Sequence, residues 1–160
     1  MNFTSEQLRF ASIPGHTIRA DFAGGGLSSD LGPLLLSGVD RQIGLTQRLT
    51  AALVDTRHAS YITHTYRDIL AQRIYQIGCG YEDGNDSNAL RNDPMFRLGA
   101  GRLPFDGDGA LASASTISRF EHAVSNKDIY RLSQALVEQF IASFATPPKT
   151  LILDLDHSED

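Results

Sequence analysis

The sequence predicts a mainly α-helical fold with a short N-terminal β-hairpin-like segment and an orphan strand at the C-terminus. Between residues 39 and 144, apolar residues recur at three- and four-residue steps, which is the spacing of a helix face. Residues 16–22 instead alternate between apolar and polar, as a half-buried strand does. Residues 150–155 are mostly apolar and follow Pro147 and Pro148, which should end the last helix.

The N-terminal part is expected to contain the hairpin. Residues 1–15 have the character of a loose leader and end in a proline–glycine turn signal. The strand expected at 16–22 is followed by three consecutive glycines, which break it, and then by the apolar run 34–36. We therefore expect the strand at 16–22 and the apolar run to form the two arms of a hairpin-like entry.

Helical periodicity then continues to residue 144. The last helix has the clearest signals, because Ser125 and Asp128 resemble a capping box ahead of an apolar stripe that starts at Ile129. In the helix predicted at residues 87–98, Pro94 is expected to start a new turn. The helices are predicted at residues 39–53, 66–81, 87–98, 116–123 and 125–144.

Composition bounds the protein class. Of the 160 residues, 41% are hydrophobic and 21% are charged. This composition is typical of one ordinary soluble domain and argues against a wholly disordered chain. The apolar runs 34–36 and 151–153 have three residues each, far below the roughly 20 needed to span a bilayer. The N-terminus has no secretory signal pattern, and the single cysteine, Cys79, cannot form an intrachain disulfide. We therefore expect a cytoplasmic protein with no membrane partner.

The acidic C-terminus is the sharpest chemical feature. The net charge is −5, and four carboxylates fall within the last seven residues. Asp154 and Asp156 lie two residues apart at the end of the expected strand, so both would be on one face and could hold Mg²⁺. Haloacid-dehalogenase-like phosphatases and RNase H-like nucleases and transposases both use such a strand. The alternative is a solvated acidic chain end.

A second feature is a group of donor side chains near the start of the helix at 116–123. The four donors are Ser115, Thr116, Ser118 and Arg119. Hydroxyl and guanidinium donors at a helix start are typical of surfaces that meet DNA phosphates and base edges. The alternative is an ordinary amphipathic helix that buries Ile117 and Phe120.

Other candidate sites fail on spacing. The carboxylate-rich stretch 80–94 lacks the glycine and the terminal glutamate of a calcium loop, which favours a capped helix corner instead. No two of the five histidines have the spacing of metal ligands. Cys79 lies within a predicted helix and is expected to be a buried small hydrophobe.

Taken together, these features resemble the N-terminal part of a bacterial insertion-sequence transposase of the DDE type, in the insertion-sequence thirteen-eighty family. The resemblance runs from Ile18 to Asp160. The most specific part is Gly-Tyr-Glu-Asp-x-Asn-Asp at 80–86 with Leu-Arg-x-Asp-Pro at 90–94. Further matching stretches are 20–30, 68–79, 116–121 and 153–160.

The resemblance implies a helical region, here 16–148, that handles transposon-end DNA, followed by an RNase H-like catalytic domain whose first strand is 149–160. Three acidic residues of that domain bind two divalent metal ions, Mg²⁺ or Mn²⁺. Asp156 best fits the family's first catalytic and metal-binding aspartate, with Asp154 as the alternative. The expected partner is transposon-end DNA, and a homo-oligomer is left open.

The second aspartate and the final glutamate of the family are missing from this sequence. We therefore expect a truncated chain that binds no metal stably and neither cuts nor joins DNA by itself. Two other interpretations stay open: a fragment of an Asp-x-Asp phosphatase, and a stand-alone helical DNA-binding regulator.

Overall fold

The computed structural model describes residues 8–9, 17, 19–20, 30–104 and 109–153, and these residues are mainly helical. The helices are α1 (Gly32–Ile43), α2 (Leu45–Ala51), α3 (Tyr66–Gly78), α4 (Ser87–Leu90), α5 (Pro94–Gly99), α6 (Ala114–Ala123) and α7 (Asn126–Ala142). Two 3₁₀ turns, η1 (Ala59–Tyr61) and η2 (Gly84–Asp86), lie between them. The two strands β1 (Leu8–Arg9) and β2 (Arg19–Ala20) have two residues each.

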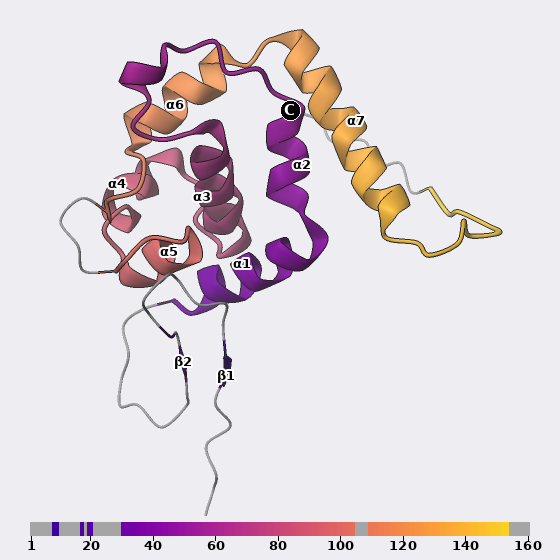
Figure 1. Ribbon diagram of the computed structural model, residues 1–160, viewed down its shortest axis with the longest axis horizontal. Helices are drawn as coiled ribbons and strands as arrows, with labels where there is room; N and C mark the ends of the chain where they lie inside the picture. Colours follow the sequence, from indigo (N-terminus) through magenta and orange to yellow (C-terminus); the bar gives the residue numbers. More distant parts are fainter. Residues whose placement is uncertain (1–7, 10–16, 18, 21–29, 105–108, 154–160) are drawn as a thin grey trace, which may run out of the picture.

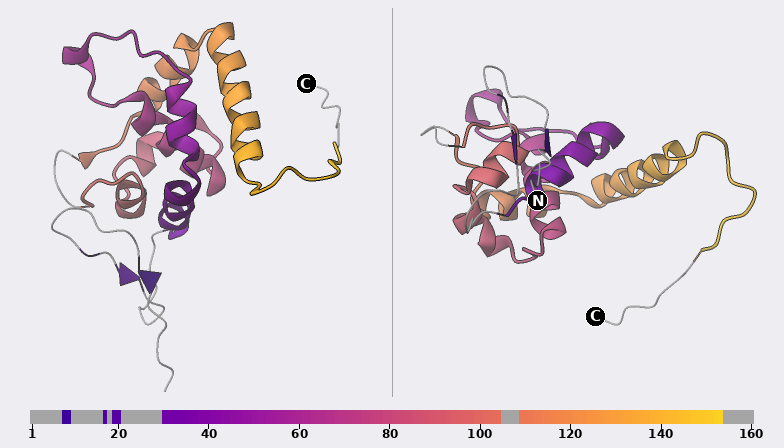
Figure 2. Two further views of the ribbon diagram at one scale, coloured as in Figure 1. Left: turned by 45° about the vertical axis from the view of Figure 1, so that its right-hand side comes forward. Right: turned by 90° about the horizontal axis from the view of Figure 1, so that it is seen from below.

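Helix α3 lies in the middle of a body formed by α1 to α6 (Figure 1). Helices α1, α2 and α6 all pack against α3, and α5 packs against α1. Helix α7 follows α6 after a short link, packs beside α2, and extends away from the rest of the body (Figures 1 and 2).

Two apolar clusters form the core of this body. The first contains Ile69, Ala112, Ile117 and Phe120, and therefore joins α3 to α6. The second contains Ala71, Tyr75, Phe96 and Leu111, and joins α3 to α5. The segment before α6 takes part in both clusters through Leu111 and Ala112. No residue of α7 belongs to the buried part of either cluster among the residues that the structure describes.

Helix starts follow the local capping signals. Thr65 and Asp68 form a reciprocal capping box on α3, and Ser125 and Asp128 form one on α7, which confirms the predicted capping box. Asp93 accepts hydrogen bonds from the first-turn amides of α5, where Pro94 occupies the first turn as predicted. The helices predicted at 66–81, 87–98, 116–123 and 125–144 thus correspond to α3, α4 with α5, α6 and α7.

The helix predicted at 39–53 is two helices. Gly44 has a positive φ of 71° and ends α1, and α2 begins at the next residue. Such a backbone conformation suits glycine, which has no Cβ to clash. The Asp40 side chain, near the end of α1, accepts a hydrogen bond from the Thr46 amide at 2.8 Å and so fixes the corner.

The predicted hairpin is wrong. Residues 34–36 belong to α1, which Pro33 helps to start and which buries Leu34 and Ser37 on one face. Three leucines in a row fit a buried helix segment as well as a strand, and periodicity over so short a run does not distinguish them. In the structure β2, inside the predicted strand at 16–22, pairs antiparallel with β1 instead.

The predicted C-terminal strand is not supported either. Residues 150–153 have no strand conformation, and Ile152 and Leu153 are 92% and 81% exposed, while residues 154 and 155 lie outside the described residues. A strand needs a neighbouring strand for its backbone hydrogen bonds, and the described residues supply none here. No helix in the described part of the chain is long and apolar enough to cross a membrane.

Candidate functional site

Helix α6 combines a buried apolar face with an exposed polar one. Ile117 and Phe120 are 1% and 8% exposed and pack in the core. Ser115, Ser118 and Arg119 are exposed on the same helix. The amphipathic helix and the donor-bearing surface are therefore two faces of one element, and the first does not exclude the second.

The predicted donors lie close together at the start of α6. The Ser113 hydroxyl lies 3.1 Å from the hydroxyls of both Ser115 and Thr116. Arg119 donates from Nη2 to the Thr116 hydroxyl at 3.2 Å. Among the described residues Arg119 forms no ion pair, so its positive charge stays available to an anion in solvent. Ser118 contacts His122 one turn later.

A hollow of about 420 Å³ adjoins this helix, between α6 and the long connection from α2 to α3. Thr116 and Arg119 line one side, and Arg57, Tyr61 and His64 line the other. Sequence reasoning missed this second side, because the connection has no helical or strand periodicity. Its signal was composition: basic, aromatic and hydroxyl side chains alternate through residues 56–66.

Arg57 has several partners at this hollow. Its guanidinium lies 4.4 Å from the ring centroid of Tyr66, and it forms an ion pair with Asp55 at 2.6 Å. The hydrogen bond between the two side chains lowers the pKa of Asp55 and raises that of Arg57. Arg57 also donates to the His64 carbonyl at 3.1 Å, which ties the two ends of the connection together.

His64 is a neutral acceptor on the same wall. Partial burial lowers its pKa, and the nearby Arg102 charge lowers it further. Arg102 approaches the ring Nδ1 at 3.3 Å and also pairs with Asp68 at 3.6 Å. Because a guanidinium can only donate, Nδ1 must accept and the ring proton must be on Nε2.

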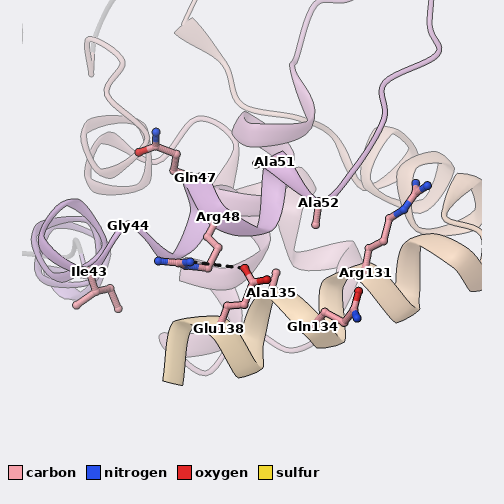
Figure 3. A pocket seen from close by; sticks show the side chains of 10 residues that line it. All are labelled: Ile43, Gly44, Gln47, Arg48, Ala51, Ala52, Arg131, Gln134, Ala135 and Glu138. Carbon is pink, nitrogen blue, oxygen red and sulfur yellow. Dashed lines mark ion pairs between the residues drawn. The ribbon is translucent and has the colours of Figure 1, made fainter. Parts of the chain in front are cut away.

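A second hollow, of about 580 Å³, lies between α2 and α7 (Figure 3). Its walls carry the small side chains Ala51, Ala52 and Ala135, and Arg48 crosses it to pair with Glu138 at 3.7 Å. The sequence did not predict this groove, because its alanines come from two separate segments that no spacing rule connects. It contains no pair of nucleophile and base, and we assign it no chemistry.

Tyr75 is buried and Cys79 is half-buried in the body, and neither belongs to a catalytic arrangement of described residues. The Asp40 carboxylate accepts from the Thr46 hydroxyl at 2.5 Å and from the Tyr75 hydroxyl at 3.0 Å, and burial with this contact raises the pKa of Tyr75 to about 12. Burial and the neighbouring Asp30 raise the pKa of Cys79 to about 11. Cys79 therefore stays a thiol at neutral pH, and it is half-buried where the sequence predicted a buried residue.

The described residues contain no group of three or more metal-ligating side chains. Asp154 and Asp156, the predicted metal ligands, lie outside the described residues. Asp83, the first residue of the rejected calcium loop, accepts from the Asn85 amide at 2.9 Å and caps η2. The described part of the chain thus offers no fit for a metal ion.

Comparison with known proteins gives one result. No curated protein and no solved structure matches the chain. Residues 10–160 match the family described as transposase DDE domain group 1. Such transposases generally use divalent metal ions and act on DNA. Because the match covers nearly the whole sequence, the chain belongs to the transposase DDE domain group 1 family.

Proposed function

We propose that the chain acts in DNA transposition by binding transposon-end DNA through α6 and the wall facing it. The family match supports a role in transposition, and the exposed donors of α6 beside Arg57 support the location. Within the family, we propose membership of the insertion-sequence thirteen-eighty group, on the 80–86 and 90–94 runs.

The observation that carries the location is the position of Arg119. It is exposed, forms no ion pair within the described residues, and lies on the rim of a hollow lined with hydroxyls. Its neighbours Ser115 and Ser118 are exposed hydroxyls on the same helix. Guanidinium and hydroxyl groups are among the donors that proteins use to contact DNA phosphates, so this rim suits a phosphate backbone.

Asp156, or Asp154, is proposed as the first metal-binding and catalytic aspartate of the family, on an RNase H-like strand at 149–160. One pair of carboxylates cannot hold two metal ions, so we do not expect Asp154 and Asp156 alone to support DNA cleavage. A nicking assay on transposon-end DNA with Mg²⁺ or Mn²⁺ tests this. Strong cleavage that Asp156→Ala abolishes would contradict it.

DNA binding is tested by fluorescence anisotropy over a range of salt concentrations. The probe is a duplex of the terminal inverted repeat that borders the encoding gene, and the reference is a scrambled duplex of equal length. If Arg119 contacts a phosphate, Arg119→Ala should weaken binding and reduce the magnitude of the salt slope by about 1.

Arg131→Ala is the matched control. It removes the same charge from an exposed arginine that bonds a side chain three residues earlier, Asp128, as Arg119 bonds Thr116. It lies on α7, away from the α6 rim. Equal losses in both variants, or no preference for the inverted repeat, would overturn the proposed interface.

A further inference from the structure

Asp55 and Arg57 form a two-point contact in the connection from α2 to α3, which runs beside α6 (Figure 1). Arg57 Nε donates to Asp55 Oδ1 at 2.8 Å, and Arg57 Nη2 donates to Asp55 Oδ2 at 2.6 Å. A guanidinium forms the same pair of parallel hydrogen bonds with two oxygens of a phosphate group. Asp55 therefore occupies the position on Arg57 that a phosphate would take.

The guanidinium of Arg57 is also held by contacts that do not involve Asp55. It lies 4.4 Å from the centroid of the Tyr66 ring, and Nη2 donates to the His64 carbonyl at 3.1 Å. Both partners lie at the other end of the connection, next to the start of α3. These two contacts should keep the guanidinium in place when the Asp55 carboxylate leaves, which favours binding of another anion at the same atoms.

The charge around the hollow beside α6 favours an anion. The described residues that line it include Arg57, His64 and Arg119, and none of them is a carboxylate. Asp55 lies outside this lining and offsets the charge of Arg57. The hydrogen bond from Arg57 lowers the pKa of Asp55, so the carboxylate is ionised at neutral pH. One cation of the hollow is thus paired with an anion from the chain itself.

Replacing Asp55 by another anion should cost little. The side chains of Arg57 and Asp55 are 32% and 25% exposed, so water reaches both. Ion pairs that water reaches contribute little to stability. A carboxylate that turns into solvent regains its hydration, and the guanidinium makes the same two hydrogen bonds to a phosphate that it made to Asp55.

We propose that Arg57 is a phosphate-binding residue of the DNA interface and that Asp55 occupies it in the free chain. A DNA phosphate at the hollow displaces the Asp55 carboxylate, so Asp55 acts as an internal competitor that lowers the affinity for DNA. The inference rests on the proposed DNA-binding function and adds an autoinhibitory contact within that same site. Its consequence is specific: removing the charge of Asp55 strengthens DNA binding.

A purely structural role for Asp55 gives the opposite expectation. Asp55 Oδ1 also accepts from the Arg57 amide at 3.1 Å, which fixes the turn at 55–57. An asparagine can keep this bond with its side-chain oxygen, but it carries no negative charge. Asp55→Asn therefore separates competition with phosphate from support of the turn. If Asp55 only oriented Arg57, the substitution would weaken DNA binding.

Fluorescence anisotropy with the inverted-repeat duplex, at about 0.1 M salt, tests the competition. Asp55→Asn should lower the Kd for this duplex about two- to fivefold, the range expected from an ion pair that water reaches. Arg57→Ala should weaken binding. In the Arg57→Ala background, Asp55→Asn should change the Kd by less than about twofold, because no guanidinium is left to compete for.

Glu138→Gln is the matched control. The Glu138 carboxylate also pairs with an arginine, Arg48, at 3.7 Å, and the substitution removes the same charge. Glu138 lines the groove between α2 and α7 and does not line the hollow beside α6. The control should bind DNA like the wild type. Equal gains in Asp55→Asn and Glu138→Gln overturn the proposal, as does unchanged or weaker binding by Asp55→Asn.

A titration with inorganic phosphate tests the Arg57 site without DNA. The NMR signal of the Arg57 Nε–H group reports on an atom that Asp55 contacts in the free chain. This signal should saturate at a lower phosphate concentration in Asp55→Asn than in the wild type, and an equal response in the two proteins would overturn the inference. A chain without preference for the inverted repeat contradicts the proposed function alone, because the phosphate titration still decides whether Asp55 competes at Arg57.

Discussion

The α1–α6 body and helix α7 obey the same sequence rules but differ in what their apolar residues touch. In the body, Phe96 and Ile69 are almost fully buried between helices. In α7, which has an amphipathic pattern and a complete capping box, Ala135 is the single buried residue. Periodicity thus indicates which face of a helix is apolar, while the tertiary packing decides what covers that face.

The largest expected contrast is between two phenylalanines. Phe96→Ala should destabilise the chain by about 3–5 kcal/mol, because it empties a site that is 1% exposed between α5 and α3. Phe140→Ala should cost about 1 kcal/mol or less in the monomer, because half of its surface is already in water. Urea denaturation of each variant measures both free energies of unfolding. If both alanine variants lost the same free energy in the monomer, the division between a packed body and an uncovered α7 would be wrong.

The sequence predicted most helices because their signals are local. The helix predicted at 66–81 and the capping box of α7 depend on residues a few positions apart, and both are in the structure. The buried side of α3 includes Gln72 and Gln76, however, which hydrophobic periodicity does not predict. The hairpin prediction failed because residues 34–36 contact partners that are distant in sequence: Leu36 packs against the cluster around Phe96. The strand at 150–155 depended on a pairing partner, which a local pattern cannot supply.

For the same reason, the sequence predicted the α6 side of the candidate site but not the wall that faces it. Ser115, Thr116, Ser118 and Arg119 fall within one turn or so of a helix start, where spacing has meaning. The facing wall, with Arg57 and His64, lies about sixty residues earlier in an irregular connection, and no spacing rule relates it to α6. The core contacts of Phe120 and Tyr66, whose rings lie 4.8 Å apart, bring the two together.

The next contrast is between the side-chain amides of Gln72, which is buried, and Gln139, which is partly buried. Gln72 on α3 is 2% exposed and forms two hydrogen bonds with the Ala112 backbone, at 2.8 and 2.9 Å. Gln72→Ala leaves both backbone groups without a partner in the core and should cost about 1–3 kcal/mol. Gln139→Ala removes two hydrogen bonds of α7, one to Arg48 on α2 and one to the Ile43 carbonyl on α1, but water can replace them there, so we expect about 1 kcal/mol or less.

Hydrogen exchange distinguishes the two amide variants by location as well as size. Gln72→Ala should speed exchange throughout the body, because it loosens the segment that joins both core clusters. Gln139→Ala should speed exchange mainly in α7 and leave α3 protected. Equal exchange in α3 for the two variants would show that α7 and the body unfold as one unit.

The smallest expected effect is a pH dependence that separates the two regions. The pKa of His64 is lowered below 6.5 in the folded body, so the unfolded chain binds more protons as pH falls. Its contribution to stability is therefore complete above pH 6.5 and is lost as pH falls through the lower folded pKa. On α7, hydrogen bonds from Ser125 lower the pKa of Asp128 below 3.8, so the contribution of that cap is lost only at much lower pH.

Between about pH 7 and pH 5, His64→Gln should flatten the decline in thermal midpoint, whereas the exposed control His122→Gln should leave it unchanged. A decline of the same slope in both variants would mean that His64 is not the titrating group, and protonation would then not distinguish the body from α7.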